Sequence, residues 1–308
     1  MMKKTNLCTA AALVAAMTVS CSDKGKSELQ TKVDEYAVVN ISSPLMDNLS
    51  DKDRQVLNLF RSAAVVIDDL FWQQTFGDKT AMDALSSQAE KDFAKINYGP
   101  WDRLDNNSPF VSGYGEKPAG ACYYPADITK AEFDAYDDPA KNSPYTVLRR
   151  NADGSLKTVW YRDEYKASLD KICLYLEEAA GITENPGLKN YLKKRVEAFR
   201  TDEYYESDLA WMDMKDSNID IVIGPIENYD DKLNEIKTSY ECFILLKDEE
   251  RSRDLAKYVS MLPDLQKILP CPEEYKTFVP GTSSDLNVYD AVYYAGDCNA
   301  GSKTIAIN

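Results

Sequence analysis

The feature that most constrains the fold is a pair of apolar segments, residues 219–226 and 240–247, joined by a polar turn. In the first segment, aliphatic residues fall on both sides of an extended chain, which is typical of a strand covered on both faces. The second segment is aromatic and aliphatic and carries a single acid, Glu241. The sequence therefore predicts two adjacent, buried strands, around which the rest of the chain has to pack.

Two acids, Glu227 and Glu241, occupy positions in this strand pair that are predicted to be buried. Glu227 and Tyr229 follow the first strand two residues apart, so they point to the same face of an extended chain. An unpaired carboxylate at the position of Glu241 would cost several kcal/mol. Two interpretations stay open: an ordinary salt bridge to a nearby lysine or arginine, or a pocket that binds the cation of an amine substrate.

The residues around these acids resemble a known family. The run GPIENYDD (224–231), followed by YECFILLKD (240–248), is similar to a segment of dipeptidyl peptidase III and its bacterial relatives, which are zinc metallopeptidases. In that family the acid and tyrosine of the turn and the acid of the strand bind the free amino terminus of the peptide that is cut. The resemblance implies this role for Glu227, Tyr229 and Glu241.

Three further blocks resemble bacterial members of the same family. They are GPWDRLDN (99–106), KPAGACYYPADITKAEF (117–133) and VYDAVYYAGDCNAGSKTIAIN (288–308). The resemblance covers most of the chain after about Asp34, in order. It also implies that Asn308 stands where the family has an asparagine that binds the peptide backbone.

The family's zinc site is absent from this sequence. That site is a helix with the pattern H-E-x-x-x-H or H-E-x-x-H plus a later glutamate, whereas the chain contains no histidine. In relatives the helix follows the block that ends this chain. We therefore expect the N-terminal portion of a longer protein, with zinc bound by the full-length protein, and neither zinc nor a catalytic residue in this chain, which we expect to be inactive alone.

The expected fold class is α+β: a mainly helical N-terminal lobe with a small mixed β-sheet, which the resemblance implies to be part of a two-lobed metallopeptidase. Residues 1–21 are predicted to be a lipoprotein signal peptide with its lipobox, and residues 22–40 a polar tether. Residues 41–308 are predicted to form the N-terminal lobe and the start of the catalytic region.

Periodicity predicts the remaining elements. A long helix should start at the capping pair Ser50 and Asp53 and end at Gly77, and a second should span residues 80–96. A hairpin is expected at residues 145–161. Further helices are expected at residues 162–180, 186–199, 202–211 and 249–268, the last broken by a proline, and a strand at 288–294. In the loop that follows, Asp297 and Asn299 are expected to bond the backbone.

The connection from residue 98 to 125 is rich in aromatic residues, proline and glycine. Loops of this length are either functional or held in place by their own side chains. The aromatic residues favour internal packing, and a wall of a substrate cleft is the alternative.

The amino terminus indicates export. Lys3 and Lys4 precede a short apolar run, residues 7–16, and Ser20 precedes Cys21, which is typical of a lipoprotein signal. The run is too short to span a bilayer, so we expect attachment to the membrane only through a lipid on Cys21, in the cell envelope. The alternative is an ordinary signal peptide that is cut near Ser20.

Charge and cysteine content restrict the ligands. A formal net charge of −15 excludes nucleic acid as a partner and favours cationic or amine-bearing ligands. Five cysteines remain after Cys21, and none forms a C-x-x-C pair, which argues against a structural zinc site. Cys173 and Cys242 are expected to be small core residues.

One function and two rival classes follow. The resemblance implies the substrate-positioning part of a zinc-dependent exopeptidase that releases dipeptides from peptides with a free amino terminus. The alternatives are a non-catalytic exported lipoprotein that binds peptides or other amine-bearing ligands, and a structural lipoprotein whose acids are merely paired.

Overall fold

A computed structural model describes residues 27–36, 42–277 and 286–302. Its centre is an antiparallel sheet of three strands in the order β5 (Ile219–Glu227), β6 (Ser239–Asp248), β7 (Val288–Gly296). The ladder between β5 and β6 pairs Ile219 with Leu246 and ends at Glu227 opposite Ser239. β6 is the middle strand, so both edges of its backbone are paired and its side chains are buried on both faces.

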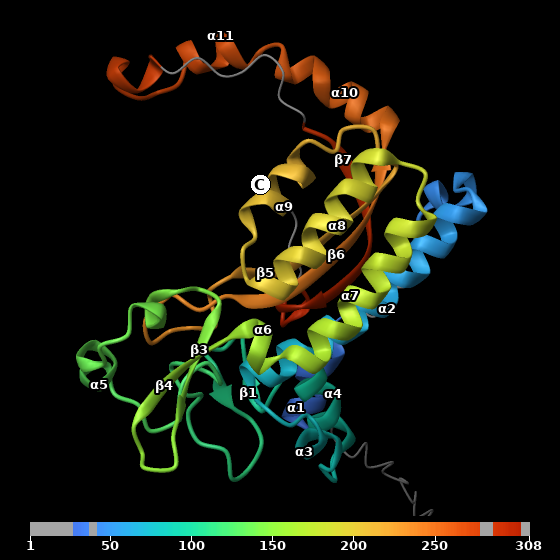
Figure 1. Ribbon diagram of the computed structural model, residues 1–308. Helices are drawn as coiled ribbons and strands as arrows, with labels where there is room; N and C mark the ends of the chain where they lie inside the picture. Colours follow the sequence, from blue (N-terminus) through green and yellow to red (C-terminus); the bar gives the residue numbers. More distant parts are fainter. Residues whose placement is uncertain (1–26, 37–41, 278–285, 303–308) are drawn as a thin grey trace, which may run out of the picture.

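Helices cover one face of this sheet. α2 (Asp51–Thr75), α7 (Lys166–Ile182) and α8 (Pro186–Thr201) lie side by side over it (Figure 1). Alternate strand residues point into this layer, and they belong to the main core: Ile219, Ile221 and Ile223 from β5, and Tyr240, Cys242, Ile244 and Leu246 from β6. The apolar residues that alternate along the strands therefore pack against the apolar residues at helical spacing in α2, and together they form one core.

Gln74 fixes α2 to the start of β6. Its side chain is fully buried; Oε1 accepts a hydrogen bond from the Tyr240 backbone N–H at 2.7 Å, and Nε2 donates to the Thr238 carbonyl at 3.2 Å. Because a buried amide must satisfy both its donor and its acceptor, this pair of bonds sets the position of the strand relative to the helix.

The other face of the sheet has a smaller apolar cluster of Val222, Phe243, Leu245 and Cys298, joined by Trp211 of α9 (Tyr205–Met212). A buried acid, Asp220, stands at its edge. The Trp211 indole Nε1–H lies 3.1 Å from both carboxylate oxygens of Asp220. Burial raises the pKa of Asp220 to about 6.

A group of short elements packs at the carboxyl end of α2. It contains α1 (Glu28–Glu35), α3 (Thr80–Asp83), α4 (Gln88–Asn97) and the two-residue strands β1 (Trp101–Asp102) and β2 (Ser108–Pro109), while η1 (Pro44–Asn48) precedes α2. Residues 28–35, expected in the tether, form a helix because Ser27 caps it and Lys32 Nζ binds Asp102 at 2.8 Å. The single helix expected at 80–96 is divided into α3 and α4.

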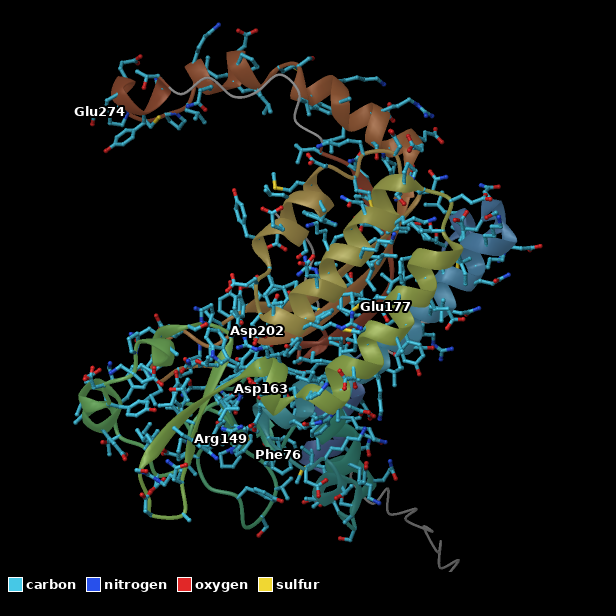
Figure 2. All side chains as sticks on the ribbon, in the orientation of Figure 1. Phe76, Arg149, Asp163, Glu177, Asp202 and Glu274 are labelled. Carbon is cyan, nitrogen blue, oxygen red and sulfur yellow. The ribbon has the colours of Figure 1, made fainter. Side chains whose placement is uncertain are left out.

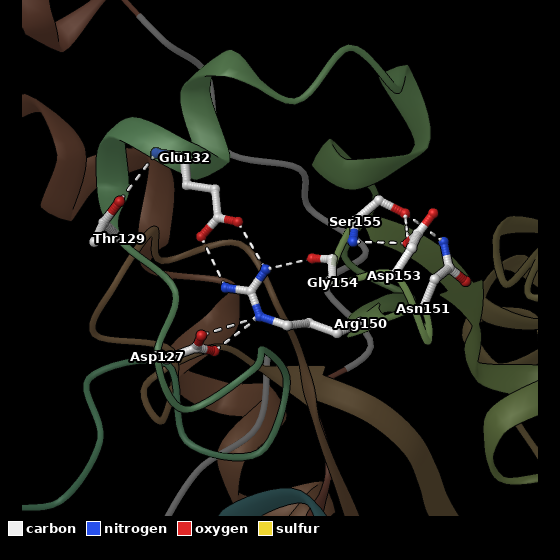
Figure 3. A network of polar contacts seen from close by, with 8 residues as sticks. All are labelled: Asp127, Thr129, Glu132, Arg150, Asn151, Asp153, Gly154 and Ser155. Atoms are coloured by element: carbon white, nitrogen blue, oxygen red, sulfur yellow. Dashed lines mark hydrogen bonds and ion pairs between the residues drawn. The ribbon is translucent and has the colours of Figure 1, made fainter.

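The predicted hairpin is present as β3 (Thr146–Arg150) and β4 (Leu156–Trp160), preceded by α5 (Lys130–Ala135) and η2 (Pro139–Asn142) and followed by α6 (Tyr161–Glu164). In its turn, Asp153 accepts hydrogen bonds from the backbone N–H and hydroxyl of Ser155. Figure 3 shows that Arg150 spans from this turn to two acids, Asp127 and Glu132. These two acids therefore share one cationic partner.

A helical arm leaves the sheet after β6. It consists of α10 (Glu249–Val259), α11 (Leu262–Lys267) and η3 (Glu273–Lys276), and it projects from the body (Figure 1). Glu274 lies at its far end (Figure 2). The break between the helices falls just before Pro263, as expected, because proline is accepted in the first turn of a helix and excluded from its interior.

The α+β class and the mainly helical lobe are confirmed. Within the described ranges every strand pair is antiparallel, whereas a mixed sheet was expected. No helix in the described part is long and apolar enough to cross a membrane. Cys21 and Asn308 lie outside the described residues.

Candidate functional site

The end of the β5–β6 ladder brings two of the predicted site residues together. Glu227 stands opposite Ser239, and Glu241 lies two residues further along β6. Residues in this relation are diagonal neighbours on one face of a sheet. The two carboxylates are close enough for the charge of Glu227 to act on the ionisation of Glu241.

Glu241 is the more unusual of the two. Its exposed fraction is only 4%, and it shares a face with the apolar residues Phe243 and Leu245. Burial raises its pKa to about 8, the carboxylates of Asp297 and Glu227 contribute in the same direction, and the backbone N–H of Cys298 opposes them. Near neutral pH the empty site therefore holds a proton, which a bound cation would displace.

A third acid at this site, Asp297, was not predicted from the sequence. Asp297 begins η4 (Asp297–Asn299), directly after Gly296, which is the register partner of Glu241. Its carboxylate acts on the pKa of Glu241, and its own pKa is raised by burial and by the charge of Asp230. In the same loop, Asn299 Nδ2 donates a hydrogen bond to the Tyr98 hydroxyl at 2.8 Å.

No cation neutralises this group of acids in the part of the chain that the structure describes. Glu227, Glu241 and Asp297 form no ion pair with any described lysine or arginine. The salt bridge that the sequence left open for Glu241 is therefore not formed by residues 27–36, 42–277 or 286–302.

The cations nearest to this site are engaged elsewhere. Arg103 binds both carboxylate oxygens of Asp230, at 2.8 and 3.0 Å, and Lys117 Nζ lies 2.8 Å from Asp230 Oδ1. All three side chains are largely buried. Burial alone would raise the pKa of Asp230, but the two cations lower it well below its usual range. Sequence reasoning missed this cluster.

Both cations come from the aromatic connection of residues 98–125, which packs as the sequence favoured. Its aromatic residues are mostly buried, including Tyr98, Trp101, Tyr123 and Tyr124. Tyr123 bonds the Ser239 hydroxyl at 2.8 Å, and Tyr124 donates to Asp231 at 2.7 Å. The connection therefore supports the β5–β6 turn from behind.

Asp231 organises the turn itself. Its buried carboxylate accepts hydrogen bonds from four backbone N–H groups, those of Leu233, Asn234, Ile236 and Lys237, at 3.0–3.2 Å. Lys237 Nζ is also fully buried and donates to the carbonyls of Lys141 and Ser143 and to the Thr146 hydroxyl, at 2.6–2.8 Å. These bonds hold the polar turn in one conformation next to Glu227.

Tyr229 does not join the two glutamates as expected. Its side chain is 65% exposed and has no hydrogen bond within the described residues. The physical reason is that the strand ends at Glu227 with a shift in register after Pro225, so the alternation of an extended chain does not continue to residue 229.

The residues present do not fit a catalytic zinc ion. The sequence has no histidine, and within the described residues no three cysteine or acidic side chains gather in a way that could hold a metal. The described cysteines are all unpaired, and Cys173 and Cys242 are buried in the core as expected. No catalytic step is assigned to this chain.

A cavity of about 420 Å³ lies away from the three acids, between α5 and the turn of residues 232–236. Its lining is polar and contains Lys130, Lys141 and Lys232 but none of the predicted site residues. Lys130 is paired with Asp134, and Lys141 donates to three backbone carbonyls. The acids at the end of β5 and β6 are therefore the better candidate site.

Comparisons with known proteins agree with this architecture. The model of peptidase family M49 matches residues 137–297. The structure of DPP III from Caldithrix abyssi is 37% identical, with a TM-score of 0.82, over 89% of this chain and 54% of that one. The dipeptidyl-peptidase III of Corallococcus sp. strain EGB is 32% identical, with a TM-score of 0.79, over 90% and 54%.

A third relative is Nudix hydrolase 3 of Arabidopsis thaliana, which is 29% identical over 343 residues, covering 91% of this chain and 44% of that protein. The chain thus spans about half the length of the relatives it matches.

Proposed function

The chain belongs to peptidase family M49, and from this premise we propose that it is the substrate-positioning part of an exopeptidase that releases dipeptides from peptide amino termini. Glu227 and Glu241 bind the free ammonium group of the peptide. Because the ammonium is fixed at the end of the sheet, the distance from it to the reacting bond is set, and cleavage falls two residues from the amino terminus.

One observation carries this proposal: Glu241 is buried without a cationic partner in the described part of the chain, although Arg103 and Lys117 lie in the same region. A buried carboxylate of this kind is costly for stability. An ammonium ligand supplies the missing charge and donates hydrogen bonds to the carboxylate.

Tyr229 and Asn308 belong to the proposal on the family resemblance alone. Tyr229 is exposed at the turn, from where its hydroxyl can reach a bound peptide. Asn308, outside the described residues, is proposed to bind the peptide backbone.

Zinc enters the proposal only as a cofactor of the full-length protein, where it would activate the attacking water. Since this chain offers no ligand set for it, the chemistry proposed here is confined to binding and orientation. The proposal places substrate binding in this chain and zinc binding elsewhere in the full-length protein. It is tested by sequencing the gene beyond codon 308 and looking for a histidine-glutamate helix.

The second candidate is a non-catalytic exported lipoprotein that uses the same acids to bind peptides, and it gains support if no histidine-glutamate helix is encoded beyond codon 308. For both candidate functions we propose that a lipid on Cys21 anchors the protein in the cell envelope. The substitution Cys21→Ala should then move the protein from the membrane to the soluble fraction or leave an unprocessed precursor, and unchanged membrane association would contradict the anchor.

Calorimetric titration of the chain with tetra-alanine and with N-acetyl tetra-alanine tests the amine site. The acetylated peptide has the same length and side chains but no cation. We expect the free peptide to bind about tenfold to hundredfold more tightly, the range of a charge-assisted hydrogen bond. Equal affinity for the two peptides would overturn the proposed function.

A further inference from the structure

The loop of residues 296–299 approaches β6 as closely as a backbone can. Gly296 has a φ of 74°, and a Cβ atom at this position would lie 2.2 Å from the Tyr240 carbonyl oxygen. Only glycine allows both the conformation and the contact. The residue that follows, Asp297, is therefore held directly beside Glu241, whose register partner is Gly296.

Hydrogen bonds from α2 and α4 fix this loop from the other side. Asp68 Oδ1 accepts a hydrogen bond from the Gly296 backbone N–H at 3.2 Å and another from the Tyr98 hydroxyl. The same hydroxyl accepts one from Asn299 Nδ2 at 2.8 Å. The position of Asp297 is thus determined at both ends of its turn.

Asp297 lies between two groups of unequal charge. On one side is the buried cluster of Arg103, Lys117 and Asp230, which has two positive charges and one negative charge. On the other side are Glu227 and Glu241, which form no ion pair with any lysine or arginine among the described residues. Asp297 interacts electrostatically with all five, and an ionised Asp297 balances the surplus positive charge of the cluster.

We propose that Asp297 is a third acid of the amine site, held beside Glu241 by the Gly296 turn and lying within electrostatic reach of Arg103 and Lys117. This inference rests on the proposed function and deepens it. Asp297 determines how strongly the site prefers an ammonium group over a neutral one, because its pKa, raised to about 7, lies below that of Glu241, raised to about 8, so Asp297 ionises before Glu241 as the pH rises.

The rival interpretation is that Asp297 only balances the charge of Arg103 and Lys117. In that case its loss would disturb the fold around the cluster and weaken every ligand alike. The two interpretations differ in which peptide is affected, so one pair of ligands separates them.

The test compares Asp297→Asn with wild type by titration with tetra-alanine and N-acetyl tetra-alanine at pH 7.5. We expect the free peptide to bind about threefold to tenfold more weakly, as for the loss of one partly buried charge, and the acetylated peptide to bind unchanged. Asp297→Glu, which keeps the charge, should restore at least half of the lost affinity. The exposed acid Asp137 provides a control of equal charge change, and Asp137→Asn should alter neither affinity.

Each result decides the question. If wild type prefers the free peptide and Asp297→Asn binds both peptides as wild type does, or loses the same factor for both, the role of Asp297 is refuted while the amine site stands. If wild type shows no preference, the amine site and the role of Asp297 fall together. Should Asp297→Asn not fold, Asp297→Ser gives the same comparison with a smaller neutral side chain.

Discussion

Asp230 and Glu241 are both buried acids of the β5–β6 hairpin, yet their surroundings are opposite. Asp230 binds two cations, and its pKa is held well below its usual range. Glu241 binds none among the described residues, and its pKa is raised to about 8. The first arrangement stabilises a charge inside the protein, whereas the second favours the neutral, protonated form of the acid.

The difference shows that a lack of cations does not explain the state of Glu241. Arg103 and Lys117 act on both Asp230 and Asp297 but form ion pairs with Asp230. The exposed acids Asp127 and Glu132 likewise share Arg150 (Figure 3). An acid that stays unpaired while its neighbours are paired is typical of a site that awaits a ligand.

The largest predicted effect is at the paired acid. Asp230→Asn leaves Arg103 and Lys117 buried without a counter-charge, which should lower the free energy of unfolding by about 3–5 kcal/mol. Urea unfolding measures this, with the exposed Asp137→Asn as a control expected to stay within about 0.5 kcal/mol of wild type. A change below about 1 kcal/mol would mean that the cluster is not a stabilising pair.

A smaller loss is expected at the turn that holds the unpaired acids together. Gly296→Ala places a methyl group 2.2 Å from the Tyr240 carbonyl oxygen and strains a backbone with φ of 74°. We expect the free energy of unfolding to fall by about 2–3 kcal/mol. Gly154→Ala, at a φ of 85° in the exposed hairpin turn with open space around it, controls for the backbone strain alone and should cost about 1 kcal/mol.

The smallest predicted effect on stability is at Glu241, and it has the opposite sign. The pKa of Glu241 is higher in the folded chain, about 8, than in the unfolded chain, so the folded state holds the proton more tightly. Its contribution to stability is therefore present at low pH and is lost as the pH rises through about 8. Asp297 and Glu227, the ionisable groups with the largest effect on it, remain in both proteins.

The substitution Glu241→Gln replaces the titrating carboxyl group with an amide of nearly the same size. Between pH 6.5 and pH 8 the stability of the variant should rise relative to wild type by about 1–2 kcal/mol. Thermal unfolding across this pH range gives the difference directly. A variant that is less stable than wild type at pH 8 would indicate a hidden partner for Glu241 and would remove the contrast with Asp230.

The sequence predicts the elements of this fold well and its long-range contacts poorly. β5 and β6 lie within one residue of their predicted ends, because alternation and apolar content define a strand locally. The helix in the expected tether is different, since α1 is stabilised by the ion pair of Lys32 with Asp102, seventy positions away. No local pattern contains such a partner.

The candidate site likewise contains residues that the sequence predicts locally and residues that only long-range contacts bring in. The sequence places Glu227 and Glu241 on neighbouring strands, and the register brings them together. Arg103 and Lys117 contact Asp230 across 127 and 113 positions, and Asp297 reaches the site because β7 pairs with β6. Tyr229 lies beyond the end of β5, after a shift in register at Pro225, so its orientation does not follow from the alternation of an extended chain and its role stays a prediction.

The most direct measurement of the central claim is the affinity of Glu241→Gln for tetra-alanine and its acetylated form, by calorimetry at pH 7.5. If Glu241 is kept without a partner for a peptide ammonium, the variant should lose about tenfold to hundredfold in affinity for the free peptide and bind the acetylated peptide as wild type does. A variant that keeps the full preference of wild type for the free peptide would contradict the account.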